Sequence, residues 1–252
     1  MIEIGDVTKT YNNVAVLENV TATIPRGGVT SIIGPNGAGK STLLSIISRL
    51  LDADWGRVSV NGMDVSTTPS DKLATCLSVL RQENQFTSRL TVAELVGFGR
   101  YPYTKGRLNA DDRERIEAAM AFLNLTELRD RFLDELSGGQ RQRAYVAMVL
   151  CQDTEYVLLD EPLNNLDMKH AVAMMRQIRR AADELGKTIV LVIHDINFAS
   201  AYSDYIIAMR QGQIIYNGTP EEIMVPEVLE DIFDTKVAIE KVHNQRIAVY
   251  YR

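Results

Sequence analysis

The stretch TSIIGPNGAGKSTLLSII, residues 30–47, decides the fold of this 252-residue chain. It begins with a short apolar strand, Thr30 to Ile33, and passes through a glycine-rich loop. From Lys40 to about Leu51 the apolar residues then recur at helical spacing. A strand that turns directly into a helix is the opening of a strand–helix–strand unit, which is the building block of an α/β fold.

The loop fits the pattern G-x-x-x-x-G-K-[ST] at every position. Its glycines let backbone N–H groups approach an anion, and the N-terminus of the following helix adds its positive dipole end. We expect Lys40 to reach the β- and γ-phosphates of a nucleotide and the Ser41 hydroxyl to ligate Mg²⁺. The alternative, a glycine-rich turn with an incidental lysine, is disfavoured by the strand before it and the helix after it. The expected nucleotide-binding residues are Gly34, Pro35, Asn36, Gly37, Ala38, Gly39, Lys40, Ser41 and Thr42.

The chain around this loop reads as one α/β domain over residues 1–252. Strand patterns fill the N-terminus, at Ile2 to Thr8, Val14 to Leu17, Thr21 to Ile24 and Arg57 to Val60. From about Thr91 helices dominate, and strands return at Tyr156 to Leu159 and Thr188 to Ile193 around a helix at Asp167 to Leu185. We therefore expect a mainly parallel sheet with helices on both faces. The approximate subdivisions are a nucleotide-binding core (1–87 and 151–220), a helical subdomain (88–150) and a small C-terminal element (221–252) with strands near Val237–Val242 and Arg246–Tyr250.

A second strand ends in two carboxylates. Tyr156 to Leu159 is apolar, and Asp160 and Glu161 follow it directly. In a parallel sheet the carboxyl end of a strand lies at the ligand-binding edge, so Asp160 is placed to hold Mg²⁺ through its water shell. Glu161 is assigned as the general base that orients the attacking water. A solvated Asp-Glu turn is the alternative, and the phosphate loop elsewhere in the chain argues against it.

The bulk composition excludes several classes of protein. The net charge of −6 and pI of about 5.2 argue against a nucleic-acid partner. Cys76 and Cys151 have neither the spacing of a zinc site nor that of a disulfide framework, and we expect buried free thiols in a reducing compartment. The N-terminus has no leader pattern, and no apolar run approaches the ~20 residues of a membrane span. We expect a cytosolic protein whose membrane role, if any, comes through a partner.

The segment Leu136-Ser137-Gly138-Gly139-Gln140 completes a set of motifs. Alone it is a helix N-terminus, with Ser137 as the cap and glycines that leave room for an anion. Together with the phosphate loop before it and the Asp-Glu strand end after it, it resembles the ATP-binding cassette of ABC proteins, over essentially the first 220 residues. The resemblance implies a P-loop NTPase core with an N-terminal antiparallel β subdomain and an inserted α-helical subdomain, and ATP with Mg²⁺ as its cofactor.

The resemblance also implies roles for single residues. Tyr11 is similar to the aromatic residue that stacks on adenine, Gln82 to the glutamine that touches Mg²⁺ or the attacking water, and His194 to the switch histidine at the γ-phosphate. Each of the three has a purely structural alternative, as a packed tyrosine, a polar residue after a strand and a satisfied histidine. Asp167 matches the D-loop, but Asn164 stands where a serine is commoner, which puts a cross-dimer hydroxyl contact in doubt. Ser137, Gly138, Gly139 and Gln140 are implied to complete the ATP site of the opposite protomer in a two-fold homodimer.

Within the family, the chain is similar to transport motors, because it has one cassette and no sustained heptads over residues 86–134. Segments 99–103 and 161–170 resemble the motors of iron–siderophore importers. Such a motor implies integral membrane permease subunits, an extracytoplasmic substrate-binding protein and a place on the cytoplasmic face of the membrane. Phe86, Phe98, Tyr101 and Tyr103 are interpreted as a docking surface for the permease, or alternatively as core residues of the helical subdomain. Import of haem, cobalamin or a metal ion, and a soluble ABC ATPase in translation or repair, are the alternative functions.

Overall fold

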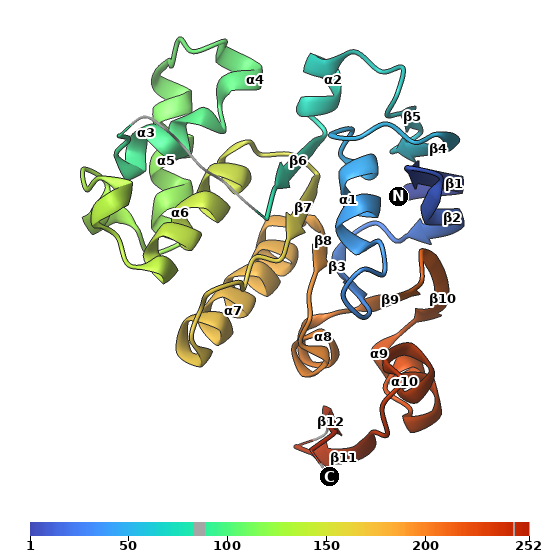
Figure 1. Ribbon diagram of the computed structural model, residues 1–252. Helices are drawn as coiled ribbons and strands as arrows, with labels where there is room; N and C mark the ends of the chain where they lie inside the picture. Colours follow the sequence, from blue (N-terminus) through green and yellow to red (C-terminus); the bar gives the residue numbers. More distant parts are fainter. Residues whose placement is uncertain (83–88, 244, 252) are drawn as a thin grey trace. The chain divides into compact units, whose positions relative to one another are not determined.

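The computed structural model describes residues 1–82, 89–243 and 245–251 (Figure 1). The chain divides into two compact units: one is formed by residues 1–68 and 188–252, the other by residues 69–187. Each is described by itself. This division cuts the chain differently from the three-part subdivision expected from the sequence, which stays a prediction.

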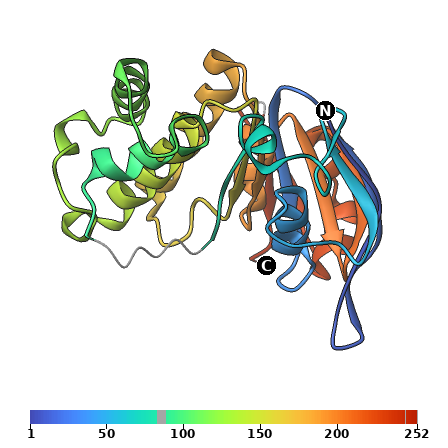
Figure 2. The ribbon, with the colours of Figure 1, turned by 90° about the horizontal axis from the view of Figure 1, so that it is seen from above.

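The first unit carries two sheets and a C-terminal hairpin. Its elements are β1 (Ile2–Tyr11), β2 (Val14–Ile24), β3 (Gly28–Ile33), α1 (Lys40–Ile47), β4 (Trp55–Val60), β5 (Met63–Asp64), β8 (Thr188–Val192), α8 (Ile196–Tyr202), β9 (Tyr205–Arg210), β10 (Gln213–Gly218), α9 (Pro220–Ile223), α10 (Pro226–Phe233), β11 (Ala238–Val242) and β12 (Gln245–Val249). Strands β2, β1, β4 and β5 form an antiparallel sheet, whereas β3 lies between β8 and β9, parallel to both. Helix α1 contacts strands of both sheets, β2 and β4 on one side and β8 on the other (Figure 2). Its apolar residues, Leu43, Leu44, Ile46 and Ile47, are buried there.

The second unit is mainly helical. Its elements are α2 (Ser70–Ala74), β6 (Leu77–Leu80), α3 (Val92–Phe98), α4 (Tyr101–Thr104), α5 (Ala110–Phe122), the 3₁₀ turns η1 (Thr126–Leu128) and η2 (Leu133–Glu135), α6 (Gly138–Cys151), β7 (Tyr156–Asp160) and α7 (Met168–Leu185). Strands β6 and β7 are parallel and in register from Leu77 opposite Tyr156 to Leu80 opposite Leu159. Helices α3 and α5 pack on α6 (Figure 1). The parallel strand pairs, the antiparallel N-terminal sheet and the helical insert confirm the α/β fold class.

Capping boxes formed by residues close together in the sequence define the starts of two helices. Thr91 with Glu94 forms a capping box at α3, and Thr219 with Glu222 forms one at α9, which begins with Pro220. The helix expected from Lys40 to about Leu51 is shorter and ends at Ile47. Arg49 takes a left-handed φ of 56°, which closes the helix, and its guanidinium donates to the carbonyls of Val65 and Thr68.

Two further expectations are corrected. The strands predicted at Val14 to Leu17 and at Thr21 to Ile24 are one strand, β2, because a bulge with Asn19 at a positive φ continues the ladder. Both cysteines were expected to be buried, but only Cys151 is, and Cys76 is half-buried.

None of the helices in the described part of the chain is long and apolar enough to cross a membrane.

Candidate active site

The phosphate loop joins β3 to α1 in the first unit. Lys40 is 5% exposed, and its ammonium donates to the carbonyl oxygens of Gly34 at 2.8 Å and Pro35 at 2.9 Å. Gly34 has φ 142°, and a Cβ there would lie 2.0 Å from the carbonyl oxygen of Met209 on β9. Only glycine fits this close approach of two backbones. The loop therefore curls around the lysine head group, with the N-terminus of α1 behind it.

Tyr11 ends β1, and the residue is 47% exposed. The residues before it are fixed by Asp54, whose carboxylate accepts from the Lys9 ammonium and from both the N–H and the hydroxyl of Thr10, each at 2.7 Å. The Lys9 bond, followed by those from Thr10, lowers the pKa of Asp54 to about 2. The end of β1 is thus anchored while the tyrosine ring stays open to a ligand.

His194 follows β8. Because β8 and β3 are parallel, with Val192 opposite Ile32, the histidine and the phosphate loop leave the sheet at the same edge. The N–H of Ile193 donates to the carbonyl of Ile32 at 3.2 Å, which extends the pairing to the residue before the histidine. The structure thus brings together two elements of the predicted site, the loop and His194, in the first unit.

The two carboxylates stand at the end of β7 in the second unit. Asp160 is 8% exposed, and Glu161 begins the turn after it in the left-handed region, with a φ of 50°. The Gln82 amide donates to Oε2 of Glu161 at 2.8 Å, and the Asn164 amide donates to the same oxygen at 2.5 Å. Gln82 lies near because β6 runs parallel to β7. Two motifs 79 residues apart, the glutamine and the proposed base, are therefore in direct contact.

The predicted signature residues begin α6. The Ser137 hydroxyl accepts from the N–H of Gln140 at 3.3 Å, and the Gln140 side chain accepts from the N–H of Ser137 at 2.9 Å. This capping box confirms Ser137 as the N-cap. A Cβ on Gly138 would have ordinary room, whereas one on Gly139 would lie 2.9 Å from the ring of His170.

His170 links the signature to the D-loop. Asp167 caps α7 by accepting from the His170 N–H at 2.8 Å, and its carboxylate also lies 2.7 Å from His170 Nδ1. These contacts, the backbone bond first, lower the pKa of Asp167. Signature and D-loop therefore meet around one imidazole ring, a contact that no sequence motif indicated.

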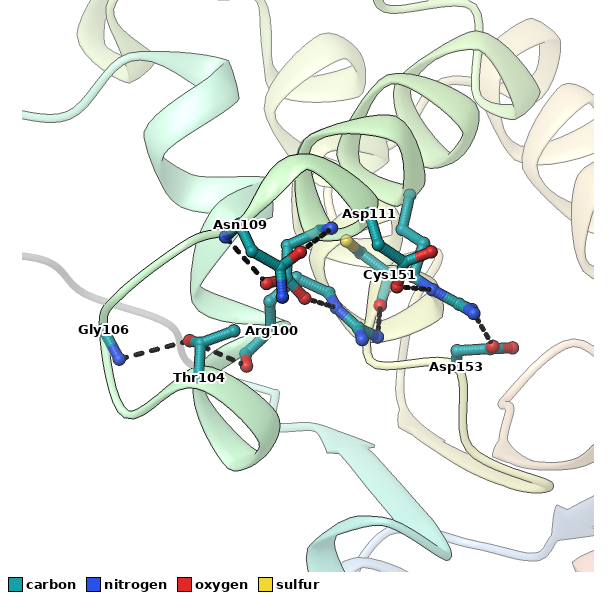
Figure 3. A network of polar contacts seen from close by, with 9 residues as sticks. Arg100, Thr104, Gly106, Asn109, Asp111, Cys151 and Asp153 are labelled. Carbon is teal, nitrogen blue, oxygen red and sulfur yellow. Dashed lines mark hydrogen bonds and ion pairs between the residues drawn. The ribbon is translucent and has the colours of Figure 1, made fainter.

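The opposite end of α6 is fixed by Arg100, a buried residue that sequence reasoning missed (Figure 3). Its guanidinium pairs with Asp112 at 3.0 Å and donates to the carbonyl oxygen of Cys151 at 3.0 Å, the last residue of α6. The N–H of Asn109, followed by Arg100, lowers the pKa of Asp112. The available signal was an arginine inside an aromatic helical segment, which by itself does not distinguish burial from exposure.

Three exposed aromatic residues lie near Arg100 in the sequence. Phe98, Tyr101 and Tyr103 are 48%, 56% and 43% exposed, as a docking surface requires and a core position would not allow. The Arg100 guanidinium stacks on the Tyr103 ring, 4.1 Å from its centre. Phe86, the fourth residue predicted for this surface, lies outside the described residues.

Residues 17–164 match the family model described as ABC transporter. The chain belongs to this family. It is 52% identical to the petrobactin import ATP-binding protein YclP of Bacillus subtilis (strain 168) over 100% of both chains. It is 58% identical to the petrobactin import ATP-binding protein FatE of Bacillus anthracis, over 99% of this chain and 100% of the relative.

Solved structures agree with this assignment. One of them is the dimeric, post-hydrolysis structure of the ATP-binding cassette MJ0796 bound to ADP and Pi. The match covers 87% of this chain and 99% of the MJ0796 chain. It has a TM-score of 0.78 and 29% identity. An inward-facing, putative metal-chelate type ABC transporter chain gives a TM-score of 0.85 over 99% of this chain and 98% of its own, and at 21% identity it supports the fold alone. The protein is an ATP-binding ABC-type ATPase.

Proposed function

We propose that the chain is the motor subunit of an importer that takes up an iron–siderophore complex, and that petrobactin is the first siderophore to test. The observation that carries this proposal is that the chain is more than 50% identical in sequence, over its full length, to two petrobactin import ATP-binding proteins. Ferric enterobactin and hydroxamate import proteins are more distant, at 40% and 38% identity. The motor works on the cytoplasmic face of the membrane, bound to permease subunits that receive cargo from an extracytoplasmic substrate-binding protein.

ATP binds on the first unit of each protomer. Adenine stacks on the exposed ring of Tyr11, and the phosphates enter the loop of residues 34–42. The Lys40 ammonium, now bonded to two loop carbonyls, turns to the β- and γ-phosphates. His194, at the same sheet edge, contacts the γ-phosphate.

Mg²⁺ fits the donor groups that the chain offers. The Ser41 hydroxyl, the Gln82 amide oxygen and the Asp160 carboxylate are hard oxygen donors, which Mg²⁺ prefers. Among the described residues there is no cluster of three or more histidine, cysteine or acidic side chains suited to a metal. The three oxygen donors suit an ion that is also held by phosphates and water. When bound, Mg²⁺ neutralises charge on the β- and γ-phosphates.

Glu161 is the general base in this proposal. Its carboxylate accepts two amide hydrogen bonds on one oxygen, from Gln82 and Asn164. Movement of Gln82 toward the nucleotide would release one of these bonds and leave the carboxylate able to take a proton from the attacking water. Gln82 would in this way link the arrival of the nucleotide to the activation of the base.

The second half of each ATP site comes from a second copy of the chain. Residues 137–140 lie at a helix N-terminus, which is favourable for an anion. We propose that they bind the γ-phosphate of ATP held by the opposite protomer, so that hydrolysis requires a homodimer with two-fold symmetry. Asp167 contributes by holding His170 beside Gly139.

The permease docks on the exposed rings of Phe98, Tyr101 and Tyr103. Arg100 stacks on the Tyr103 ring and donates a hydrogen bond to the last residue of α6, whose first residues are the signature. Closure of the dimer around ATP is thereby connected to the permease through one 14-residue helix. The ATP has only to bias a transport element with two stable states.

The test is uptake of radioactive iron bound to petrobactin, enterobactin or a hydroxamate, in cells whose own copy is deleted and replaced. Wild type and Glu184→Gln, an exposed helix variant, should restore uptake of the iron–petrobactin complex. Glu161→Gln should not, and the purified variant should hydrolyse ATP ~10²–10⁴-fold more slowly while accumulating an ATP-bound dimer. Normal uptake of all three complexes in the deletion strain would overturn the iron assignment and direct the search to haem, cobalamin and metal ions. Purification with ribosomes or DNA in place of membranes would overturn the transport function itself.

A further inference from the structure

The C-terminal hairpin contains no motif of the ATPase. Strands β11 and β12 pair with each other from Ala238 opposite Val249 to Val242 opposite Gln245, and form a two-stranded sheet. An isolated hairpin of two strands is marginally stable in water. Its position must therefore depend on the contacts it makes with the rest of the first unit.

One of these contacts is a two-way bond with Asn197 on α8. The Ala248 N–H donates to the Asn197 amide oxygen at 2.7 Å, and the Asn197 amide nitrogen donates to the Ala248 carbonyl at 3.3 Å. The Asn197 side chain thus forms hydrogen bonds with both the N–H and the carbonyl of the buried residue Ala248, as the backbone of a neighbouring strand would. One turn further along, the Ser200 hydroxyl donates to the Arg246 carbonyl at 2.9 Å.

Arg246 ties the same strand to a second helix. Its guanidinium donates to the carbonyls of Glu221, at 2.7 Å, and Met224, at 3.1 Å, at the C-terminal end of α9. The hairpin therefore joins α8 to α9 by hydrogen bonds that involve both its backbone and a side chain.

Helix α8 begins at Ile196, two residues after His194. Its N-cap, Asp195, accepts from the N–H groups of Asn197 and Phe198 at 2.8 and 3.1 Å. The backbone of Asn197 thus fixes the cap, while its side chain is bonded to the hairpin. A displacement of this first turn moves His194, which is two peptide units from the N–H of Ile196.

A cavity of about 300 Å³ lies between His194 and the C-terminal segment. Its walls are residues of the switch segment, His194 and Ile196, and residues of the C-terminal segment, which are Phe233, Thr235, Val237, Ala248 and Tyr250. The histidine therefore borders a cavity on this side, and in the chain it lies between Ile193, which is paired to the sheet, and the first turn of α8.

We propose that Asn197 is a positioning residue for His194 and that the C-terminal hairpin, acting through it, sets the rate of ATP hydrolysis. This inference rests on the role proposed above for His194. The reaction is sensitive to such positioning, because a catalytic group displaced by about 1 Å can cost up to ~100-fold in rate. The hydrogen bonds of the Asn197 side chain and N–H go to the hairpin and to the cap of α8, so we expect its loss to act on kcat more than on the KM for ATP.

The test is steady-state ATP hydrolysis by the full-length protein. Asn197→Ala should lower kcat ~5- to ~50-fold while the KM for ATP stays within about twofold. Arg246→Ala, which frees the hairpin from α9, should act in the same direction. Lys241→Ala, an exposed residue of the same hairpin, is the matched control and should match wild type. Thermal melting of each variant shows that it is folded; should Asn197→Ala melt early, Asn197→Asp, which keeps the acceptor for the Ala248 N–H, replaces it.

A double-mutant cycle separates positioning from general destabilisation. If Asn197 acts through the histidine, Asn197→Ala should slow wild type but have no further effect in a His194→Ala background. An equal slowing in both backgrounds, or no slowing in wild type, would overturn the inference. A His194→Ala variant as fast as wild type would instead overturn the role of His194 proposed above, which is a distinguishable result.

Discussion

Gly139→Ala tests whether the signature and the D-loop are coupled inside one protomer. The added Cβ would lie 2.9 Å from Cδ2 and 3.0 Å from Cγ of His170, and 3.3 Å from its Cβ. Ordinary contacts begin near 3.4 Å, so the ring must move by roughly half an ångström. Since His170 Nδ1 lies 2.7 Å from the Asp167 carboxylate, the movement disturbs the D-loop as well.

The size of the effect follows from the same geometry. Forcing one extra carbon into a packed site costs about 1–3 kcal/mol. Replacing glycine by alanine in a helix also raises the stability by up to about 1 kcal/mol. Gly138→Ala should have this gain without a steric clash, because the atom nearest to its added Cβ is the Asn165 carbonyl oxygen at 3.8 Å. The difference between the two alanine variants therefore isolates the clash. At about 3 °C per kcal/mol for a chain of this size, Gly139→Ala should melt about 3–9 °C below Gly138→Ala.

The assay is thermal melting of both variants, alone and combined with His170→Ala. Removing the ring should restore Gly139→Ala to the stability of the His170→Ala single variant, with a coupling of at least ~1 kcal/mol. Both glycine variants should lose ATP-driven dimer formation, because either methyl group occupies the space for the opposite ATP. Equal melting temperatures for Gly138→Ala and Gly139→Ala, or a clash that His170→Ala does not relieve, would refute the proposed contact between the two motifs.

Three shorter predictions concern groups elsewhere in the two units. Asp54→Asn should raise the KM for ATP a few-fold without changing kcat, because it loosens the strand end that carries Tyr11. With a pKa of about 2, below the ordinary value near 4, Asp54 is ionised throughout pH 5–8, so the difference in KM between Asp54→Asn and wild type should not vary with pH there. The stabilisation by the ionised carboxylate is lost only as the pH falls from about 4 toward 2. Burial raises the pKa of Cys151 to about 12, so iodoacetamide at pH 8 should label this thiol only after unfolding, as mass spectrometry would show; labelling of the folded protein would contradict this. Asn164→Ala should raise basal phosphate release a few-fold, because it removes one donor from the Glu161 carboxylate, and a slower release would show that Asn164 orients the base.

Local chemistry explains why much of this structure was predictable. The phosphate loop, the helix cap at Ser137 and the strand that ends at Asp160 each depend on residues within a few positions of one another. Such signals survive in a single sequence, because the hydrogen bonds or glycine conformations they require are formed locally. Their order along the chain then indicated the family.

Features that depend on distant residues were not predictable. Helix α1 ends early because Arg49 reaches the carbonyls of Val65 and Thr68, and no periodicity encodes that contact. The burial of Arg100 depends on Asp112 and on the end of α6, 51 residues away. The role of the C-terminal strands was likewise open, because Asn197 and Ala248 are 51 residues apart and neither belongs to a motif.

Asn164 lies in a sequence motif, the D-loop, but its contact with Glu161 is seen only in the structure. A serine is commoner at this position, and its hydroxyl would be available for a contact across the dimer. The longer asparagine side chain instead reaches back to Glu161 in its own protomer, and meets Gln82 on the same carboxylate oxygen. In the mechanism proposed above the two amides occupy one oxygen of the Glu161 carboxylate, so we expect hydrolysis to be restrained within each protomer until nucleotide and partner draw the amides away. An importer motor that must wait for loaded cargo would benefit from such a restraint, since ATP hydrolysed before the permease is engaged does no transport.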